Sequence, residues 1–141
     1  MATRIVIDTN IFINVLIGKD GSASRELFRR CLKRQCQPLM GNALFAEYQD
    51  VLGRDRIIAK CPLTTKEKAN LLTAFMSVCE WIKIYYLWRP NLRDEADNHL
   101  IELAVAGNAE IIVTRNTKDF KQSQLRFSQF DILTPEQTLN Y

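Results

Sequence analysis

The sequence lacks any long apolar run. Its uninterrupted apolar stretches are only a few residues long, far short of the roughly 20 residues that an α-helix needs to cross a bilayer. The first residues, Met1 to Arg4, lead straight into a β-rich run and lack the apolar segment and cleavage site of a secretory signal peptide. We therefore expect a cytoplasmic protein with no membrane partner.

Residues that bind soft metals are also scarce. The chain has four cysteines without a C-x-x-C pair, and its single histidine, His99, is distant from them in sequence. A zinc site is therefore not expected, and a disulfide framework does not suit a chain without a secretion signal. We interpret the cysteines as buried or half-buried small hydrophobic residues.

Several enzyme motifs are missing as well. The sequence contains no G-x-S-x-G elbow, no P-loop, no G-x-G-x-x-G fingerprint and no paired cysteine and histidine for nucleophilic catalysis. A receiver or phosphatase domain, as an example of another Mg²⁺-dependent α/β phosphotransferase, needs a lysine near an aspartyl nucleophile. No lysine follows a predicted strand in that way, so we disfavour this class.

What the sequence does have is a regular alternation of strand and helix patterns. Strands are predicted over 4–8, 37–40, 109–113 and 130–133, with a β-rich stretch over 81–88. Helices are predicted over 11–17, 21–34, 42–53, 55–60, 64–79 and 94–106. Such alternation is typical of a mostly parallel sheet with helices on both faces. Because no linker or repeat interrupts the pattern, we expect a single domain spanning 1–141.

Two acids stand where apolar residues are expected. Glu47 lies three residues after Leu44 and four before Val51, on the apolar stripe of its helix. Asp97 stands three residues before Leu100, on the apolar stripe of the helix predicted over 94–106. Because such a stripe normally faces the core, both carboxylates are expected to point inward.

Two further acids follow apolar strands. Asp8 closes the run Ile5–Ile7, and Asp119 lies in the polar loop after the run Ile111–Val113. Open α/β sheets bind their ligands at the carboxyl ends of the strands. Four segments that are distant in sequence are therefore expected to deliver an acid each to one edge of the sheet.

Clustered carboxylates need compensation. A buried carboxylate is costly when nothing pairs with it, and several together repel. No lysine or arginine lies on these stripes, so we expect one or two hard divalent cations, Mg²⁺ or Mn²⁺, with oxygen ligands. Two such ions can clamp the attacking and leaving oxygens of a phosphoryl displacement, which predicts phosphodiester hydrolysis.

Some of these acids also have simpler interpretations. Asp94 can be a helix N-cap with Asp97 three residues later, where both favour the helix dipole. Asp119 can be a turn residue. His99, directly after the acidic pair, can touch substrate, although a solvated surface histidine is the commoner case.

Basic and aromatic residues suggest a nucleic-acid partner. The net charge is +3, with 19 basic and 16 acidic residues; without the five acids assigned to the metal site, the remainder is +8, which suits a polyanion. Arg25, Arg29 and Lys33 recur every four residues and can follow a phosphate backbone, or they form an ordinary solvated face. Tyr85, Tyr86 and Trp88 can stack on unpaired bases or pack in the core.

The same residues carry a resemblance to a known family. The segment Ile5–Asn10 resembles the opening motif of PIN domains, and Glu47 resembles their second acid. The segments Arg93–Ala104 and Ile111–Phe120 are similar to the third and fourth motifs. All four occur in order over nearly the whole chain.

The resemblance implies a metal-dependent ribonuclease on a three-layer α/β/α fold with a central, mostly parallel sheet. It is closest to the toxin half of VapC-like toxin–antitoxin pairs, which implies a small antitoxin partner, an RNA substrate and a homodimer. By position, the catalytic and metal-binding acids are Asp8, Glu47, Asp97 and Asp119, with Asp94 as an auxiliary metal ligand. Residues that orient ligands or waters are Thr9, Asn10, Thr114 and Asn116.

One position departs from the family pattern. Related sequences often have an acid where Asn116 stands, so either Asp119 serves as the fourth ligand or the site has one carboxylate fewer. The alternative function is a catalytically weak PIN-like module that binds RNA or a partner protein.

Overall fold

Parallel strands form the centre of the molecule. The computed structural model describes residues 2–18, 21–84, 98–120 and 129–141, and within them five strands pair in the order β3-β2-β1-β4-β5. The strands are β1 (Thr3–Ile7), β2 (Cys36–Met40), β3 (Glu80–Trp81), β4 (Ile111–Val113) and β5 (Asp131–Leu133). Every pairing is parallel, and the apolar residues of β1 and β4 are buried on both faces, as parallel sheets require.

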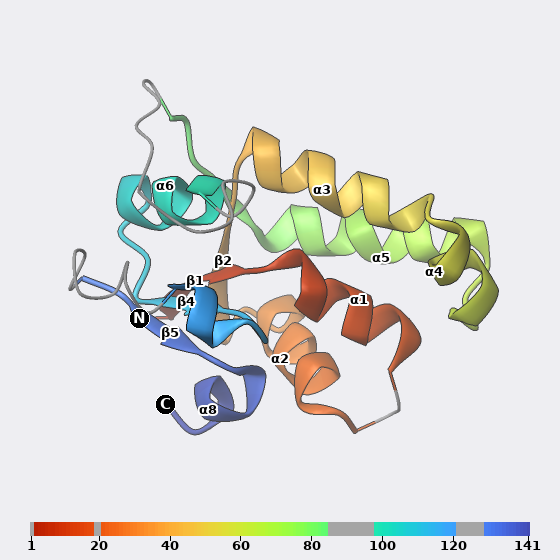
Figure 1. Cartoon of the computed structure of the whole chain (residues 1–141), viewed down its shortest axis with the longest axis horizontal. Coiled ribbons are helices and arrows are strands. Elements are labelled where there is room, and N and C mark those ends of the chain that lie inside the picture. The colour runs from red at the N-terminus through yellow and green to blue at the C-terminus, as the bar shows by residue number, and fades with distance from the viewer. Residues whose placement is uncertain (1, 19–20, 85–97, 121–128) are drawn as a thin grey trace.

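Helices cover both faces of this sheet. The described helices are α1 (Thr9–Ile17), α2 (Ala23–Leu32), α3 (Asn42–Leu52), α4 (Asp55–Lys60), α5 (Thr65–Val78), α6 (Asn98–Ala106) and α8 (Pro135–Leu139). Helix α6 contacts β1, β2 and β4, whereas α2 contacts β2 and packs against α8. In Figure 1 the strands lie between α6 on one side and α2 and α8 on the other. This arrangement confirms the predicted three-layer α/β/α fold.

Four aromatic rings join α1, α2, α3 and α5 beside the sheet. Phe12 stacks on Tyr48 and Phe28, with ring centroids 4.7 and 5.8 Å apart, and Phe75 stacks on Phe28 at 4.4 Å. The Tyr48 hydroxyl donates a 2.8 Å hydrogen bond to the Ile7 carbonyl. This bond ties α3 to the end of β1, where the predicted site begins.

Local signals explain where several helices begin. The Ser22 side chain caps α2, and capping boxes open α5 at Thr64 and α8 at Thr134. The first helix differs from expectation, because α1 begins at Thr9 rather than Ile11, and Asp8 occupies the N-cap position without making a side-chain cap. The Asp8 carboxylate is thus left for other contacts.

Some predicted helices and strands extend beyond the described residues. Only 98–106 of the helix predicted over 94–106 is described, and it is helical throughout. Of the β-rich stretch over 81–88, the described part contributes only Trp81 to a strand. The aromatic residues at 85, 86 and 88 lie outside the described residues. No helix in the described ranges is long and apolar enough to cross a membrane.

Candidate functional site

Asp8 lies at the carboxyl end of the central strand. Its backbone N–H donates to the Val113 carbonyl at 2.9 Å, which continues the pairing of β1 with β4. Its side chain is 7% exposed, and the Thr114 hydroxyl donates a 2.8 Å hydrogen bond to its Oδ2 atom. The strand pairing thus places a buried carboxylate next to a hydroxyl from the neighbouring strand.

Glu47 reaches the same edge from α3. Its Oε1 atom accepts a 3.3 Å hydrogen bond from the Thr9 hydroxyl, and Thr9 directly follows Asp8 in the chain. The neighbouring residue Tyr48 is fully buried and bonded to the Ile7 carbonyl. Because these two adjacent residues both contact the end of β1, the position of Glu47 relative to Asp8 is defined by α3 as a whole.

His99 joins the two acids from α6. Its Nε2 atom lies 2.7 Å from Glu47 Oε1, at ion-pair distance but without the alignment of a hydrogen bond. The side chain is 17% exposed, so the interpretation of His99 as a solvated surface residue is wrong. The contact arises because α6 packs against α3, which the sequence of either helix does not reveal.

Asn10 and the residues after β4 form hydrogen bonds along the rest of this edge. Asn10 donates to the Thr114 hydroxyl at 3.4 Å and accepts from the Arg115 N–H at 3.4 Å. The Asn116 N–H donates to the Thr114 hydroxyl at 3.1 Å. Thr114 therefore bridges Asp8 to the start of the loop that carries the contested fourth acid.

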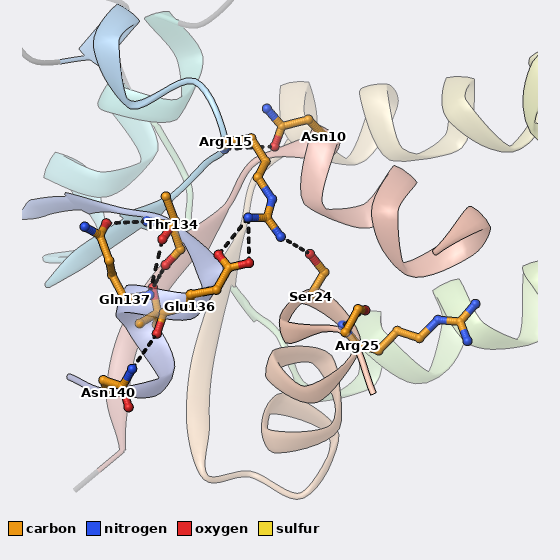
Figure 2. A network of polar contacts seen from close by, with 10 residues as sticks. Asn10, Ser24, Arg25, Arg115, Thr134, Glu136, Gln137 and Asn140 are labelled. Atoms are coloured by element: carbon orange, nitrogen blue, oxygen red, sulfur yellow. Dashed lines mark hydrogen bonds and ion pairs between the residues drawn. The ribbon is translucent and has the colours of Figure 1, made fainter. Parts of the chain in front are cut away.

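The Arg115 side chain fixes this loop to two helices. Its Nη1 atom lies 2.7 Å from both carboxylate oxygens of Glu136, and its Nη2 atom donates to the Ser24 hydroxyl at 3.3 Å. Figure 2 shows these contacts converging from α2, α8 and the loop after β4. Burial acts to raise the pKa of Glu136. Hydrogen bonds from Arg115 and the Thr134 hydroxyl act against it, and the pKa of Glu136 lies below the ordinary value.

Asp8 has the opposite electrostatic environment. Burial raises the pKa of Asp8, and the nearby Glu47 charge raises it further, whereas hydrogen bonds from Thr114 and the Thr9 backbone and the charge of His99 act in the lowering direction. The net result is a pKa above the ordinary value. Ionised Asp8 is therefore electrostatically unfavourable without an added positive charge.

The other predicted site residues do not bond to Asp8 or Glu47 within the described ranges. Asp94 and Asp97 lie outside the described residues. Asn116 has an exposed side chain, and Asp119 is half-buried in the helical turn that follows it, donating its N–H to the Asn116 carbonyl at 3.1 Å. Within the described ranges, neither side chain bonds to Asp8 or Glu47. Which of the two would serve as fourth ligand stays a prediction.

The acids that do meet have the chemistry of a divalent-metal site. Asp8 and Glu47 offer hard oxygen donors, as Mg²⁺ and Mn²⁺ prefer, and no lysine or arginine in the described part of the chain pairs with either acid. Yet the described residues hold no group of three or more acids, histidines or cysteines arranged around a metal position. The pair therefore offers two of the oxygen ligands that a divalent cation needs.

The predicted nucleic-acid contacts lie on α2. Arg25 donates from Nε to the Val15 carbonyl at 3.0 Å, and Arg29 lies 3.4 Å from Glu26. Lys33 is exposed at the end of the helix. Arg25 thus contributes to the packing of α1 on α2, and the arginines are partly engaged within the protein.

Comparisons with known proteins agree with the geometry. A family model described as a PIN domain matches residues 4–118. A chain in the crystal structure of VapBC2 from Rickettsia felis bound to a DNA fragment from their promoter has a TM-score of 0.56 and 20% identity, covering 92% of this chain and 97% of that one. At this identity the likeness shows the fold. No curated protein matches the sequence.

The family match spans most of the chain and includes Asp8, Glu47, Thr114 and Asn116. PIN domains are generally nucleases. The chain belongs to the PIN domain family.

Proposed function

We propose that this protein is a metal-dependent ribonuclease that hydrolyses phosphodiester bonds of single-stranded RNA, and that it is the toxin of a cytoplasmic toxin–antitoxin pair. The observation that carries the proposal is the buried Asp8 carboxylate beside Glu47, without a lysine or arginine partner in the described part of the chain. Buried acids with raised pKa values at a ligand-binding edge are typical of functional sites.

The residues of this edge divide the work as follows. Asp8 and Glu47, together with Asp97, bind the cation, which supplies hydroxide from water and neutralises charge on the phosphoryl group. Thr114 holds Oδ2 of Asp8 in place, and Thr9 does the same for Oε1 of Glu47. The hydroxyls keep the carboxylates oriented, as outer-shell partners of metal ligands do. Asp94 and either Asp119 or Asn116 complete the proposed set.

A cavity next to this site supports single-stranded RNA as substrate. It has a volume of about 460 Å³, and its lining includes His99, Lys83 and Trp81. Trp81 is 46% exposed and packs in a T-shaped contact against Phe45, and a partly exposed aromatic ring near the Lys83 ammonium is suited to a stacked, unpaired base. His99 links the cavity to Glu47, so a base held here would place its phosphate near the acids.

The toxin role and the partners rest on the family and on one neighbour. VapBC2 from Rickettsia felis is a pair of proteins bound to promoter DNA. By analogy, we propose a small cognate antitoxin and a homodimer for this chain. A short reading frame directly upstream and overlapping this one would support the antitoxin.

The decisive experiment is cleavage of single-stranded RNA by the purified protein with Mn²⁺ or Mg²⁺. Cleavage is expected with either ion and is expected to stop when EDTA is added. The Asp8→Asn variant should lose the activity, whereas Glu80→Gln, at an acid that is paired with Arg4, should keep it. Metal-dependent cleavage that survives Asp8→Asn would overturn the assignment.

The alternative is a PIN-like module that binds RNA or a partner protein with little turnover. The observation that favours it is the absence of a three-residue metal group among the described residues. Calorimetric titration with Mn²⁺ separates the two proposals. The nuclease requires a saturable metal site that Asp8→Asn weakens, whereas the binding module requires RNA retention on a filter without metal affinity or cleavage.

A further inference from the structure

Three thiols interact with one another beside β2, and the proposed nuclease chemistry does not use them. Cys31 lies one residue before the end of α2, Cys36 is the first residue of β2, and Cys79 directly follows α5. Cys31 is fully buried, whereas Cys36 and Cys79 are half-buried. All are free thiols.

A tight turn folds Cys36 back against Cys31. Arg34 adopts a left-handed conformation with φ of 63°. Its N–H donates to the Cys31 carbonyl at 2.9 Å, and the Gln35 N–H donates to the Arg30 carbonyl at 2.8 Å. These two bonds form the Schellman pattern that ends many helices. As a result, the first residue of β2 returns towards the last turn of α2, and the Cys36 and Cys31 side chains interact.

The surroundings of the two thiols differ in access and charge. A cavity of about 190 Å³ reaches Cys36, and Arg30 and Tyr141 contribute to its lining. A hydrogen bond from the Cys31 thiol and the nearby Arg30 guanidinium lower the pKa of Cys36 to about 7 despite its partial burial. The same hydrogen bond and burial raise the pKa of Cys31. The accessible sulfur is therefore the one that ionises first.

We propose that Cys36 is a peroxide-reactive thiol and that Cys31 is its resolving partner. The Cys36 thiolate attacks one peroxide oxygen, the O–O bond breaks, and the departing oxygen takes up a proton and leaves as water. The Cys36 sulfenic acid then reacts with the Cys31 thiol, releasing a second water as the S–S bond forms. The two thiols lose two electrons, and hydrogen peroxide gains them.

This modification site has the properties of a reversible sensor. Thiols that respond to oxidants combine thiolate character, access and a nearby resolving cysteine. Disulfides inside cells are commonly transient for that reason. Cys36 pairs in register with Thr3, five residues before Asp8, which places it about 17 Å along the strand from the acids. The proposal therefore stands independently of the nuclease.

The test uses the full-length protein and hydrogen peroxide. Brief oxidation is expected to remove two of the four thiols, to lower the intact mass by about 2 Da through loss of two hydrogens, and to be reversed by dithiothreitol. Trypsin cuts between the two cysteines at Lys33 and Arg34. The oxidised sample should thus contain a new disulfide-linked peptide pair that joins Cys31 to Cys36.

Single substitutions identify the role of each sulfur. Cys36→Ser should abolish the fast reaction, and Cys31→Ser should leave a sulfenic acid that dimedone captures. Cys61→Ser, at a thiol outside this group, is the matched control and should behave as the wild type. Cys36 is expected to react at least about 10-fold faster than Cys61. Because Cys31 is buried, Cys31→Ala with a checked circular dichroism spectrum provides a second variant.

Three results would overturn the proposal. The first is alkylation and oxidation of Cys36 no faster than those of Cys61. The second is a disulfide that maps to Cys79 rather than to Cys31. The third is stable oxidation of Cys36 to the sulfinic acid with Cys31 still reduced. None of these outcomes affects the metal-dependent cleavage by which the nuclease proposal is tested.

Discussion

Two acidic positions of the sheet have different partners. On the edge strand β3, Arg4 binds both carboxylate oxygens of Glu80 at 2.9 and 2.8 Å, and the Arg4 backbone N–H donates to Glu110 at 3.1 Å. At the carboxyl end of β1, the described partners of Asp8 and Glu47 are hydroxyls, a backbone N–H and one imidazole. Within the described residues, a guanidinium thus balances the charge of Glu80, whereas none is bonded to Asp8 or Glu47.

This contrast separates a carboxylate that is paired within the fold from one whose charge the described residues leave unbalanced. Hydrogen bonds from Arg4 lower the pKa of Glu80, whereas burial raises the pKa of Asp8. An ionised acid stabilises the folded state when its pKa is lower there than in the unfolded chain. An ionised acid whose pKa is higher in the folded state destabilises that state. An unfavourable ionised group is typical of a site where binding supplies the missing charge.

Removing the Asp8 charge is expected to have the largest effect on activity. Asp8→Asn should lower the rate of RNA cleavage at least about 100-fold, because it removes the proposed cation ligand at the reacting phosphate. In EDTA the same variant should be at least as stable to urea as the wild type, since the lost charge was unfavourable. A variant that is inactive because it is unfolded would contradict the comparison.

Removing the Tyr48 hydroxyl should shift the position of Glu47 without changing the charge of the site. Tyr48→Phe leaves the buried Ile7 carbonyl without its 2.8 Å hydrogen bond, which is expected to cost about 1–3 kcal/mol of unfolding free energy. Cleavage should fall because Glu47 follows α3, and the apparent affinity for Mn²⁺ should weaken with it. Tyr141→Phe, at an exposed ring, is the control. Unchanged Mn²⁺ affinity in a folded Tyr48→Phe protein would show that this bond does not position Glu47.

The sequence predicts the fold because its signals are local. Short β-branched runs such as Ile5–Ile7 alternate with amphipathic segments, and capping residues such as Thr64 and Thr134 mark where helices begin. Asp8 and Glu47 are recognisable for the same reason, since each is an acid in an apolar pattern. Their proximity follows from strand order, which the alternation already favours.

The contacts around these acids depend on packing between distant helices. His99 meets Glu47 only because α6 lies against α3. The Arg115 network joins α2, α8 and the loop after β4, and nothing in the residues near Arg115 indicates those partners. The helix predicted over 11–17 in fact begins at Thr9. The sequence does not show this start, because threonine and asparagine also favour the cap position before a helix, whereas here their side chains bond to Glu47 and Thr114.

The pH dependence of stability should have opposite signs for Asp8 and Glu80. Without metal, Asp8 in the folded state binds its proton more tightly than in the unfolded chain, so its contribution falls as pH rises from about 3.8 through the raised folded pKa. Glu80 contributes stability above its unfolded pKa near 4.5, and this is lost as pH falls through the lowered folded value. Urea unfolding in EDTA from acid to neutral pH should therefore show wild type losing stability relative to Asp8→Asn and gaining it relative to Glu80→Gln. If the unfolding free energies of the wild type and both variants changed with pH in parallel, the folded state would shift the pKa of neither acid, which would contradict the comparison.

The smallest effect is expected from loss of the Glu80 charge. Glu80→Gln breaks an exposed ion pair and should cost less than about 1 kcal/mol of unfolding free energy, a difference that added salt reduces further. RNA cleavage and Mn²⁺ affinity should stay at the wild-type level, because Arg4 also donates to the Gly107 carbonyl at 2.9 and 2.7 Å and keeps α6 attached to the sheet. If Glu80→Gln lowered cleavage as much as Asp8→Asn, Glu80 would also belong to the functional machinery, and charge imbalance would no longer distinguish it from Asp8.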